Sequence, residues 1–259
     1  MRFKKLISVF VIAAVSAAAM SGCKGTPAGG GSTAVTDESG NVDESTVEWL
    51  PDVEIRNFVP PEKGEKIAVI TVKDYGEIKI KLFPDEAPKG VENFIGLAES
   101  GYYDELIFHR VIKNFMNQTG DPRGDGTGGK SMWGENFEGG TSDKLYHFSG
   151  AVAYANSEGT STNGSQFYIV NTPEGYTEMS CAELYASNSA QYNWPANVAE
   201  KYKEVGGVPY LDGGYTVFGQ VIEGMDVVRA IGDAETNPEN NKPLTQVVME
   251  SVRIEEYAG

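Results

Sequence analysis

The stretch that decides the fold is Ile67–Phe83, which reads IAVITVKDYGEIKIKLF. An apolar run to Val72 is followed by the turn residues Asp74-Tyr75-Gly76, and isoleucine and leucine then alternate with glutamate and lysine. Alternation with a period of two is typical of a strand that has one face in the core and one in water. The stretch therefore predicts a β-hairpin with one wet face.

The residues after this hairpin predict a helix. Pro88 suits the first turn of a helix, and Gly101 is placed to end it. Between them, apolar residues recur at i, i+3, i+4 and i+7, which is the spacing of one helical face. They are Val91, Phe94, Ile95 and Ala98.

Six further segments have the length and composition of strands. They are Ile107–Ile112, Phe115–Gln118, Gly150–Ala155, Gln166–Val170, Thr216–Val221 and Gln246–Ile254. A second short helix, Met225–Ile231, is expected before the last strand. Eight short strands with two clear helices favour a mainly β domain, a closed barrel or a sandwich, over a parallel α/β sheet.

Length and composition agree with a globular domain. The chain has 259 residues, 40% of them apolar and 22% charged, which excludes fibrous, collagenous and wholly disordered proteins. The formal net charge is −16, and removal of Arg2, Lys4 and Lys5 with the predicted signal peptide would make it −19. So acidic a chain is not expected to bind nucleic acid.

The N-terminus predicts export. A basic start and an apolar run form a signal peptide over residues 1–22, and that run is too short for a permanent membrane span. Met20-Ser21-Gly22-Cys23 resembles a bacterial lipobox, in which the cysteine is acylated and becomes the N-terminus. Two acyl chains hold a protein stably on a membrane. We therefore expect extracytoplasmic lipid anchoring at Cys23, the alternative being a soluble secreted protein that is cleaved nearby.

Three segments follow the signal peptide. Residues 24–48 are rich in Gly, Ser, Thr and acidic residues and predict a solvated tether, and residues 49–60 are apolar enough to lie along a folded body as an arm. We thus expect a signal peptide at 1–22, a tether and arm at 23–60, and a folded domain at 61–259. Cys181 is the other cysteine, so no disulfide framework is available.

One motif is misleading. Gly124–Ser131, GDGTGGKS, matches the spacing of a nucleotide-binding P-loop. A P-loop needs a strand before it and a helix after it, so that backbone N–H groups converge on phosphate. Thr119–Arg123 and Met132–Glu135 provide neither, so we expect a glycine-rich surface loop and no cofactor. Two histidines, His109 and His147, are also too few for a three-histidine metal site, and no metal is expected.

Five ordered blocks resemble the cyclophilin family of peptidyl-prolyl isomerases, over about residues 66–255. The blocks are Phe108–Ile112, Phe115–Asp121, Gly126–Ser131, Asn163–Ile169 and Leu211–Gly219. The stretch Pro88–Phe94, continuing to Ala98, is similar to the family's first helix. The resemblance implies a closed eight-stranded antiparallel barrel, capped by two helices, with a peptide groove on its outer face.

The resemblance also implies roles for particular residues. The catalytic set is Arg110, Phe115 and Gln118, with the Arg110 guanidinium stabilising the nitrogen lone pair that forms as the X-Pro amide twists. The other substrate-binding residues are Met116, Asn156, Gln166, Tyr168, Tyr210, Leu211 and Tyr215. Phe115, together with Met116, Tyr168 and Leu211 of this second set, would form the pocket for the proline ring.

The chain departs from the family pattern at three tyrosines. Tyr215 stands where many members have His, Tyr210 where many have Trp, and Tyr168 where Phe is usual. Of the three, we expect only Tyr168 to touch the pocket. An insert over about residues 172–209 contains a helical stretch, Asn197–Glu204. It either restricts or enlarges the choice of substrate, or packs on itself as a cover over the barrel.

Three function classes follow. The leading one is a monomeric, lipid-anchored prolyl isomerase that acts on proline-containing exported polypeptides as they fold. The second is a binding module that holds proline segments without turnover, against which the intact Arg110 argues. The third is a surface protein that uses the barrel as a scaffold, for which the insert is the one supporting feature. An isomerisation assay separates the first class from the others.

Overall fold

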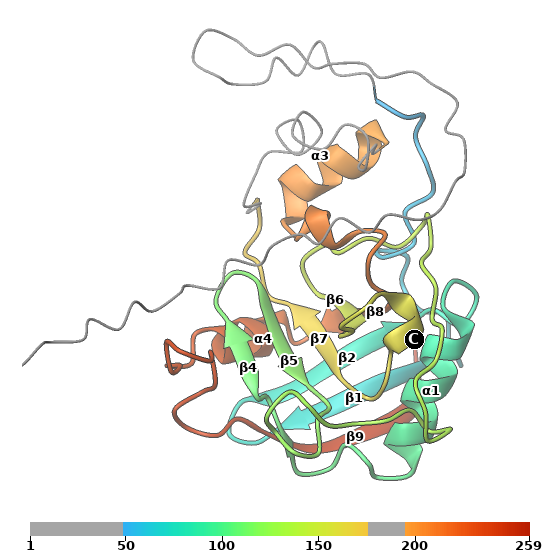
Figure 1. Ribbon diagram of the computed structural model, residues 1–259. Coiled ribbons are helices and arrows are strands. Elements are labelled where there is room, and N and C mark those ends of the chain that lie inside the picture. Colours follow the sequence, from blue (N-terminus) through green and yellow to red (C-terminus); the bar gives the residue numbers. More distant parts are fainter. Residues whose placement is uncertain (1–48, 176–194) are drawn as a thin grey trace, which may run out of the picture. The chain divides into compact units, whose positions relative to one another are not determined.

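The computed structural model describes residues 49–175 and 195–259 (Figure 1). The predicted signal peptide, Cys23 and the tether lie outside the described residues, as does the part of the insert from 176 to 194 with Cys181. No described helix is both long and apolar enough to cross a bilayer.

The hairpin that was predicted first is present. β1 (Lys66–Val72) pairs antiparallel with β2 (Gly76–Leu82), and Ile78 and Ile80 are fully buried. The predicted wet face is partly wrong, because the Lys81 side chain is buried and donates from Nζ to the carbonyl oxygen of Pro60 at 3.0 Å. The arm that precedes the domain therefore covers part of this face.

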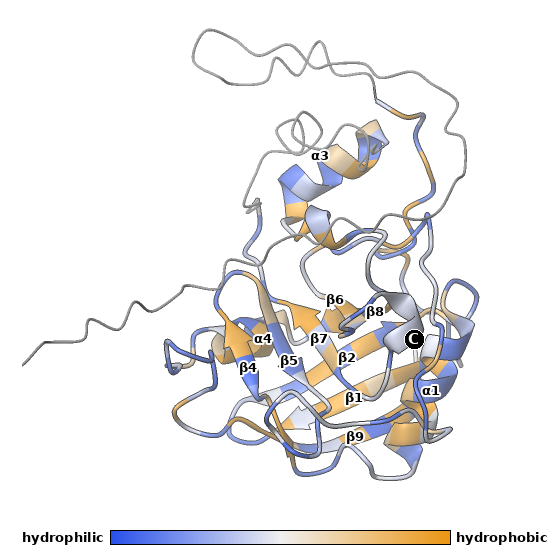
Figure 2. Ribbon diagram, in the orientation of Figure 1, coloured by the Kyte–Doolittle hydropathy of each residue, from blue (hydrophilic) through white to orange (hydrophobic). Residues whose placement is uncertain are grey.

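The other strands complete one antiparallel sheet in the order β3-β9-β1-β2-β8-β6-β7-β5-β4. Their bounds are β3 (Leu106–Ile107), β4 (Arg110–Ile112), β5 (Met116–Thr119), β6 (Ala151–Tyr154), β7 (Phe167–Val170), β8 (Val217–Glu223) and β9 (Val248–Glu256). Figure 2 shows β6 and β7 to be predominantly apolar, which fits strands buried on both faces.

One extended segment joins the two ends of this sheet. β3 pairs with β9 and β4 pairs with β5, and only Phe108 and His109 separate β3 from β4. Their backbone N–H groups continue the two ladders, Phe108 bonding to Val247 and His109 to Gln118. Counted as one strand, this segment gives the eight strands expected, and the mainly β antiparallel fold is confirmed.

Two helices pack on the sheet as predicted. α1 (Pro88–Glu99) lies against β8 and β9, and α4 (Met225–Gly232) lies against β2, β4 and β5. Phe94 is fully buried, and its ring lies 5.1 Å from that of Phe218 and 5.3 Å from that of Phe167. Aromatic rings at such separations attract one another beyond the area that they bury, so α1 is fixed on the core.

The described part of the insert contains the helix expected within it. α3 (Ala196–Val205) is followed by a short 3-10 turn, η3 (Pro209–Leu211). Tyr202 of α3 is fully buried, with its ring 4.4 Å from that of Phe148. The arm contacts the start of α3, since Leu50 forms a bridge with Pro195. For the described residues, the insert thus packs as a cover over the segment that precedes β6, through Tyr146 and Phe148.

Candidate active site

Eight of the ten predicted substrate-site residues line one small cavity of about 120 Å³, here named the central pocket. Its lining comprises Arg110, Phe115, Met116, Gln118, Ala155, Asn156, Tyr168, Leu211 and Tyr215. They come from β4, β5, β7, the end of β6 and the region after the insert. Segments that are distant in the sequence therefore meet at this pocket.

The register of β4, β5 and β7 explains how the central pocket forms. Arg110 is opposite Gln118, and Gln118 is opposite Tyr168. Because side chains alternate along a strand, Met116 and Gln118 share one face of β5. Asn117, between them, faces the other way, is fully buried, and donates from Nδ2 to the carbonyl of Val228 in α4 at 2.8 Å. This bond ties β5 to α4 and holds the pocket face outward.

Three polar side chains form a chain of hydrogen bonds along the pocket rim. Arg110 donates from Nη1 to Oε1 of Gln118 at 3.2 Å, and Gln118 donates from Nε2 to Oε1 of Gln166 at 2.9 Å. Partial burial lowers the pKa of the Arg110 guanidinium, but guanidinium groups stay charged in proteins. The rim therefore holds a half-buried cation whose partner is itself fixed by a further bond.

The glycine-rich loop supplies the last acceptors of this chain. Gln166 donates from Nε2 to the carbonyls of Gly128, at 2.8 Å, and Gly126, at 3.1 Å. The described residues 132–150 contain no helix, and Gly126 and Gly129 have φ of +86° and +97°, as expected for a surface loop that needs glycine. The loop thus points carbonyl acceptors at Gln166, whereas a P-loop points N–H groups at phosphate.

Asp121 shapes the start of this loop. Its side chain is buried and accepts the backbone N–H groups of Arg123 at 2.8 Å and of Gly126 at 2.6 Å. A carboxylate that gathers successive N–H groups fixes the turn they belong to. Asp121 lies within one of the sequence blocks, but only the folded loop reveals what its carboxylate binds.

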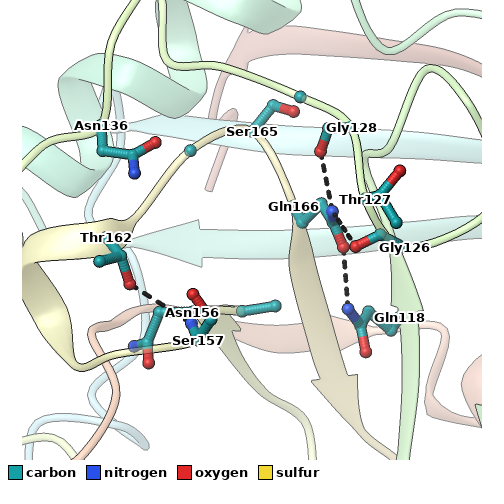
Figure 3. A pocket seen from close by; sticks show the side chains of 13 residues that line it. Gln118, Gly126, Thr127, Gly128, Asn136, Asn156, Ser157, Thr162, Ser165 and Gln166 are labelled. Atoms are coloured by element: carbon teal, nitrogen blue, oxygen red, sulfur yellow. Dashed lines mark hydrogen bonds between the residues drawn. The ribbon is translucent and has the colours of Figure 1, made fainter.

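A second cavity of about 260 Å³, the polar pocket, adjoins the central pocket (Figure 3). The two share Gln118, Ala155 and Asn156. Gln166 lines the polar pocket and not the central one. In Figure 3, Gln118 and Gln166 lie on the side opposite Asn136 and Thr162. The two pockets form one groove with an apolar part and a polar part.

The three tyrosines that depart from the family pattern take different places. Tyr168 and Tyr215 both line the central pocket, with ring centroids 5.8 Å apart and planes at 83°. The expectation that only Tyr168 touches the pocket is therefore wrong, because the chain turns after Leu211, where the Gly214 N–H donates to the Leu211 carbonyl, and Tyr215 lies in the lining as well. Tyr210 lies outside the lining and stacks on Phe115 at 6.1 Å. Burial raises the pKa of the Tyr168 phenol well above its usual value.

Sequence reasoning missed a buried pair behind the central pocket. His147 donates from Nδ1 to Oδ1 of Asp212 at 2.8 Å, and both side chains are almost wholly buried. Asp212 follows Leu211 directly within a block that the sequence identified, whereas His147 was considered only as a metal ligand. No local pattern in the sequence pairs the two, because 65 positions separate them along the chain.

The comparisons agree on one family. Residues 67–254 match the sequence profile described as cyclophilin type peptidyl-prolyl cis-trans isomerase/CLD. A candidate peptidyl-prolyl cis-trans isomerase of Staphylococcus aureus (strain USA300) is 44% identical over 195 residues, which cover 75% of this chain and 94% of the relative. One from Staphylococcus saprophyticus is 42% identical over 193 residues, which cover 74% of this chain and 94% of the relative.

Two further similarities differ in extent. A candidate bifunctional phosphatase/peptidyl-prolyl cis-trans isomerase of Streptococcus pyogenes serotype M6 is 40% identical over 222 residues, or 84% of this chain. The chain spans only 43% of that relative's length. The crystal structure of a Cryptosporidium parvum cyclophilin-type isomerase, determined with the dipeptide Ala-Pro, superposes with a TM-score of 0.55 at 28% identity, covering 74% of this chain and 99% of the other.

Proposed function

This chain belongs to the cyclophilin-type peptidyl-prolyl cis-trans isomerases, and from that membership we propose that it isomerises X-Pro bonds in exported polypeptides from a lipid anchor outside a bacterial membrane. The isomerase activity and its proline-containing substrates follow from the family. The mechanism, the roles of single residues and the location are the proposal. The observation that carries the mechanism is the half-buried Arg110 guanidinium at the rim of the central pocket.

The reaction needs no nucleophile. Rotation about an X-Pro bond crosses a barrier of about 18–20 kcal/mol, because amide resonance must be broken, and takes about 10–100 s unaided. Acceleration to milliseconds requires the barrier to fall by roughly 5–7 kcal/mol. As the amide twists, the lone pair localises on the prolyl nitrogen. A cation placed beside that nitrogen stabilises the twisted state more than either planar state.

We assign this role to Arg110. Its Nη1 bonds to Gln118, which bonds to Gln166 and through it to the loop carbonyls, so the guanidinium is held in place before substrate binds. A group that is already oriented needs no reorganisation when charge develops. Gln118 is then both the support of Arg110 and a contact for the peptide, as the shared lining of the two pockets suggests.

The central pocket would hold the proline ring while the preceding residue rotates. Met116, Tyr168 and Leu211 are nearly buried and present an apolar surface, and Phe115 closes one side. The volume of about 120 Å³ suits one small ring. Asn156 lies where the central and polar pockets meet, so the peptide would pass it on leaving the ring site.

An isomerisation assay tests the activity. The full chain in detergent micelles should accelerate cis-to-trans conversion of an Ala-Xaa-Pro-Phe peptide far above the unaided rate. Binding of the peptide without acceleration would favour the alternative of a binding module. A chain that neither binds the peptide nor accelerates its isomerisation would favour the alternative of a structural surface protein.

The proposed lipid anchor and location need a separate test, because Cys23 lies outside the described residues. The proposal rests on the basic start, the apolar run and the lipobox-like residues before Cys23. Cys23→Ala should release the protein from the membrane fraction or block its maturation, whereas Cys181→Ala, the matched control, should leave it membrane-bound. Mass spectrometry that found an unmodified Cys23, or a mature N-terminus downstream of it, would overturn the lipid anchor and leave the isomerase activity untouched.

A further inference from the structure

A buried chain of hydrogen bonds connects the insert helix α3 to the back of the central pocket. The Tyr202 hydroxyl of α3 donates to Oδ2 of Asp212 at 2.7 Å. Oδ1 of the same carboxylate accepts from the backbone N–H of His147 at 2.9 Å and from Nδ1 of its ring at 2.8 Å. The carboxylate thus binds the insert helix and the imidazole at once.

The imidazole of His147 lies directly behind two pocket walls. It stacks on Tyr168, with ring centroids 6.1 Å apart and planes at 17°, and meets Tyr215 edge-on at 6.2 Å and 80°. Tyr168 and Tyr215 line the central pocket, whereas His147 does not and is only 1% exposed. The orientation of His147 therefore limits where both walls can lie.

The position of Tyr202 is fixed by its own ring contacts and by the bonds between α3 and the arm. The Tyr202 ring packs on Phe148 and lies over Gly207, whose φ is +148° and where a Cβ atom would collide with the ring. Asn197, near the start of α3, donates to the carbonyl of Val53 in the arm at 2.7 Å and accepts its N–H at 3.3 Å. The arm, the insert and Phe148, which precedes β6, therefore place the Tyr202 hydroxyl.

We propose that Tyr202 is a positioning residue for the central pocket, acting through Asp212 and His147 on Tyr168 and Tyr215. This inference rests on the proposed isomerase function. A buried carboxylate that loses a donor must find another partner or move. Loss of the Tyr202 hydroxyl therefore lets Asp212 turn, which releases His147 and loosens the two tyrosine walls.

The expected kinetic signature is specific. The pocket walls contact the proline ring in the cis, trans and twisted states alike, so looser walls weaken binding of all three equally. Uniform weakening raises KM and leaves kcat unchanged. Tyr202→Phe, which removes only the hydroxyl, should raise KM for a proline tetrapeptide roughly three- to tenfold, the range expected for neighbours in one network, with kcat within about twofold.

A double-mutant cycle tests the route of this effect. His147→Phe keeps a ring behind Tyr168 and the backbone N–H bond to Asp212, but its ring cannot donate, so it removes the side-chain link between the insert and the pocket. In the His147→Phe protein, adding Tyr202→Phe should change KM no further. A full additional rise in KM would overturn the proposal, because Tyr202 would then act by another route.

Tyr146→Phe is the matched control. Tyr146 belongs to the same apolar cluster as Tyr202, but its hydroxyl donates to the carbonyl of Asp143. Tyr146→Phe should leave KM unchanged, and a rise in KM equal to that of Tyr202→Phe would overturn the proposal. An unchanged KM in Tyr202→Phe itself would also overturn it. Should Tyr202→Phe fail to fold, Asp212→Asn tests the same claim. If the KM of Asp212→Asn equalled that of the unaltered protein, the proposal would be overturned. Absence of turnover in the unaltered chain would instead contradict the isomerase function.

Discussion

Removal of the guanidinium at position 110 tests the proposed mechanism most directly. Arg110 is half-buried at the rim of the central pocket, and within β4 it contributes a side chain that faces the groove and not the core. Arg110→Ala should therefore leave the fold intact. It removes the one charge that the mechanism places beside the prolyl nitrogen.

The size of the effect follows from the burial of the site. A unit charge about 4 Å from another interacts with about 4 kcal/mol at an effective dielectric constant near 20, which suits a partly buried site. The lone pair that develops on nitrogen is a partial charge, so about half of this, roughly 2 kcal/mol, is a reasonable share. That corresponds to a fall of roughly 30-fold in kcat/KM.

Isomerisation of a proline tetrapeptide, followed by exchange NMR, gives the rate without a coupling protease. Lys113→Ala is the matched control, since Lys113 lies in the turn between β4 and β5 and pairs with Asp233 at 2.8 Å, in the open. It removes a positive charge three residues away and should retain full activity. Arg110→Lys should not restore the rate, because an ammonium lacks the planar fork that binds Gln118 and faces the amide together. Full activity in Arg110→Ala would refute the mechanism.

Three further predictions concern pH, the loop and inhibition. Burial lowers the pKa of His109, so as the pH falls below about 6.5 the unfolded chain takes up a proton that the folded chain does not. Denaturant titrations should therefore show that the free energy of unfolding decreases as the pH is lowered through this range, and His109→Gln should reduce this decrease. Gly129→Ala should destabilise the fold by clearly more than the roughly 1 kcal/mol expected of Gly134→Ala, since both have positive φ but only at Gly129 would a Cβ collide with Ser165; equal midpoints would contradict this. Cyclosporin-sensitive members of the family commonly carry Trp where this chain has Tyr210, so we expect cyclosporin to bind this chain roughly 5- to 150-fold more weakly than it binds such members. Tyr210→Trp should strengthen the inhibition, and nanomolar inhibition of the natural sequence would contradict the prediction.

The sequence predicted the strands well because period-two alternation reports burial directly. Ile78 and Ile80 alternate with lysine and are fully buried, and the core positions of α1 follow from their spacing in the same way. It could not predict that Lys81 would be covered, because the covering residue, Pro60, belongs to the arm and carries no periodic signal. The local pattern of apolar and polar residues does not predict the tertiary contacts of an irregular segment.

In the candidate site, too, contacts that follow from local strand register could be predicted, whereas contacts between distant segments could not. Arg110 and Gln118 face one another across one hairpin, so their contact is local and follows from strand register. The bond from Tyr202 to Asp212 depends on how the insert helix packs on Tyr146 and Phe148, and the short stretch between Tyr202 and Asp212 does not determine it. Local residues were therefore identified by their blocks, whereas the buried Asp212–His147 pair was visible only in the folded chain.

The position of the insert in the chain has a consequence for how the site can vary. The half of the groove that would carry the chemistry comes from β4 and β5, which are joined by a tight turn with Asn114 at φ +58°. The opposite wall, from Leu211 to Tyr215, begins where the insert ends. Changes in the insert can therefore move the wall that we propose for the proline ring without moving Arg110. A chain built in this way can change which segments it binds while the cation that we propose lowers the barrier stays in place. For this reason the Tyr202 variant is expected to alter KM, and the Arg110 variant is expected to alter kcat/KM through the chemical step.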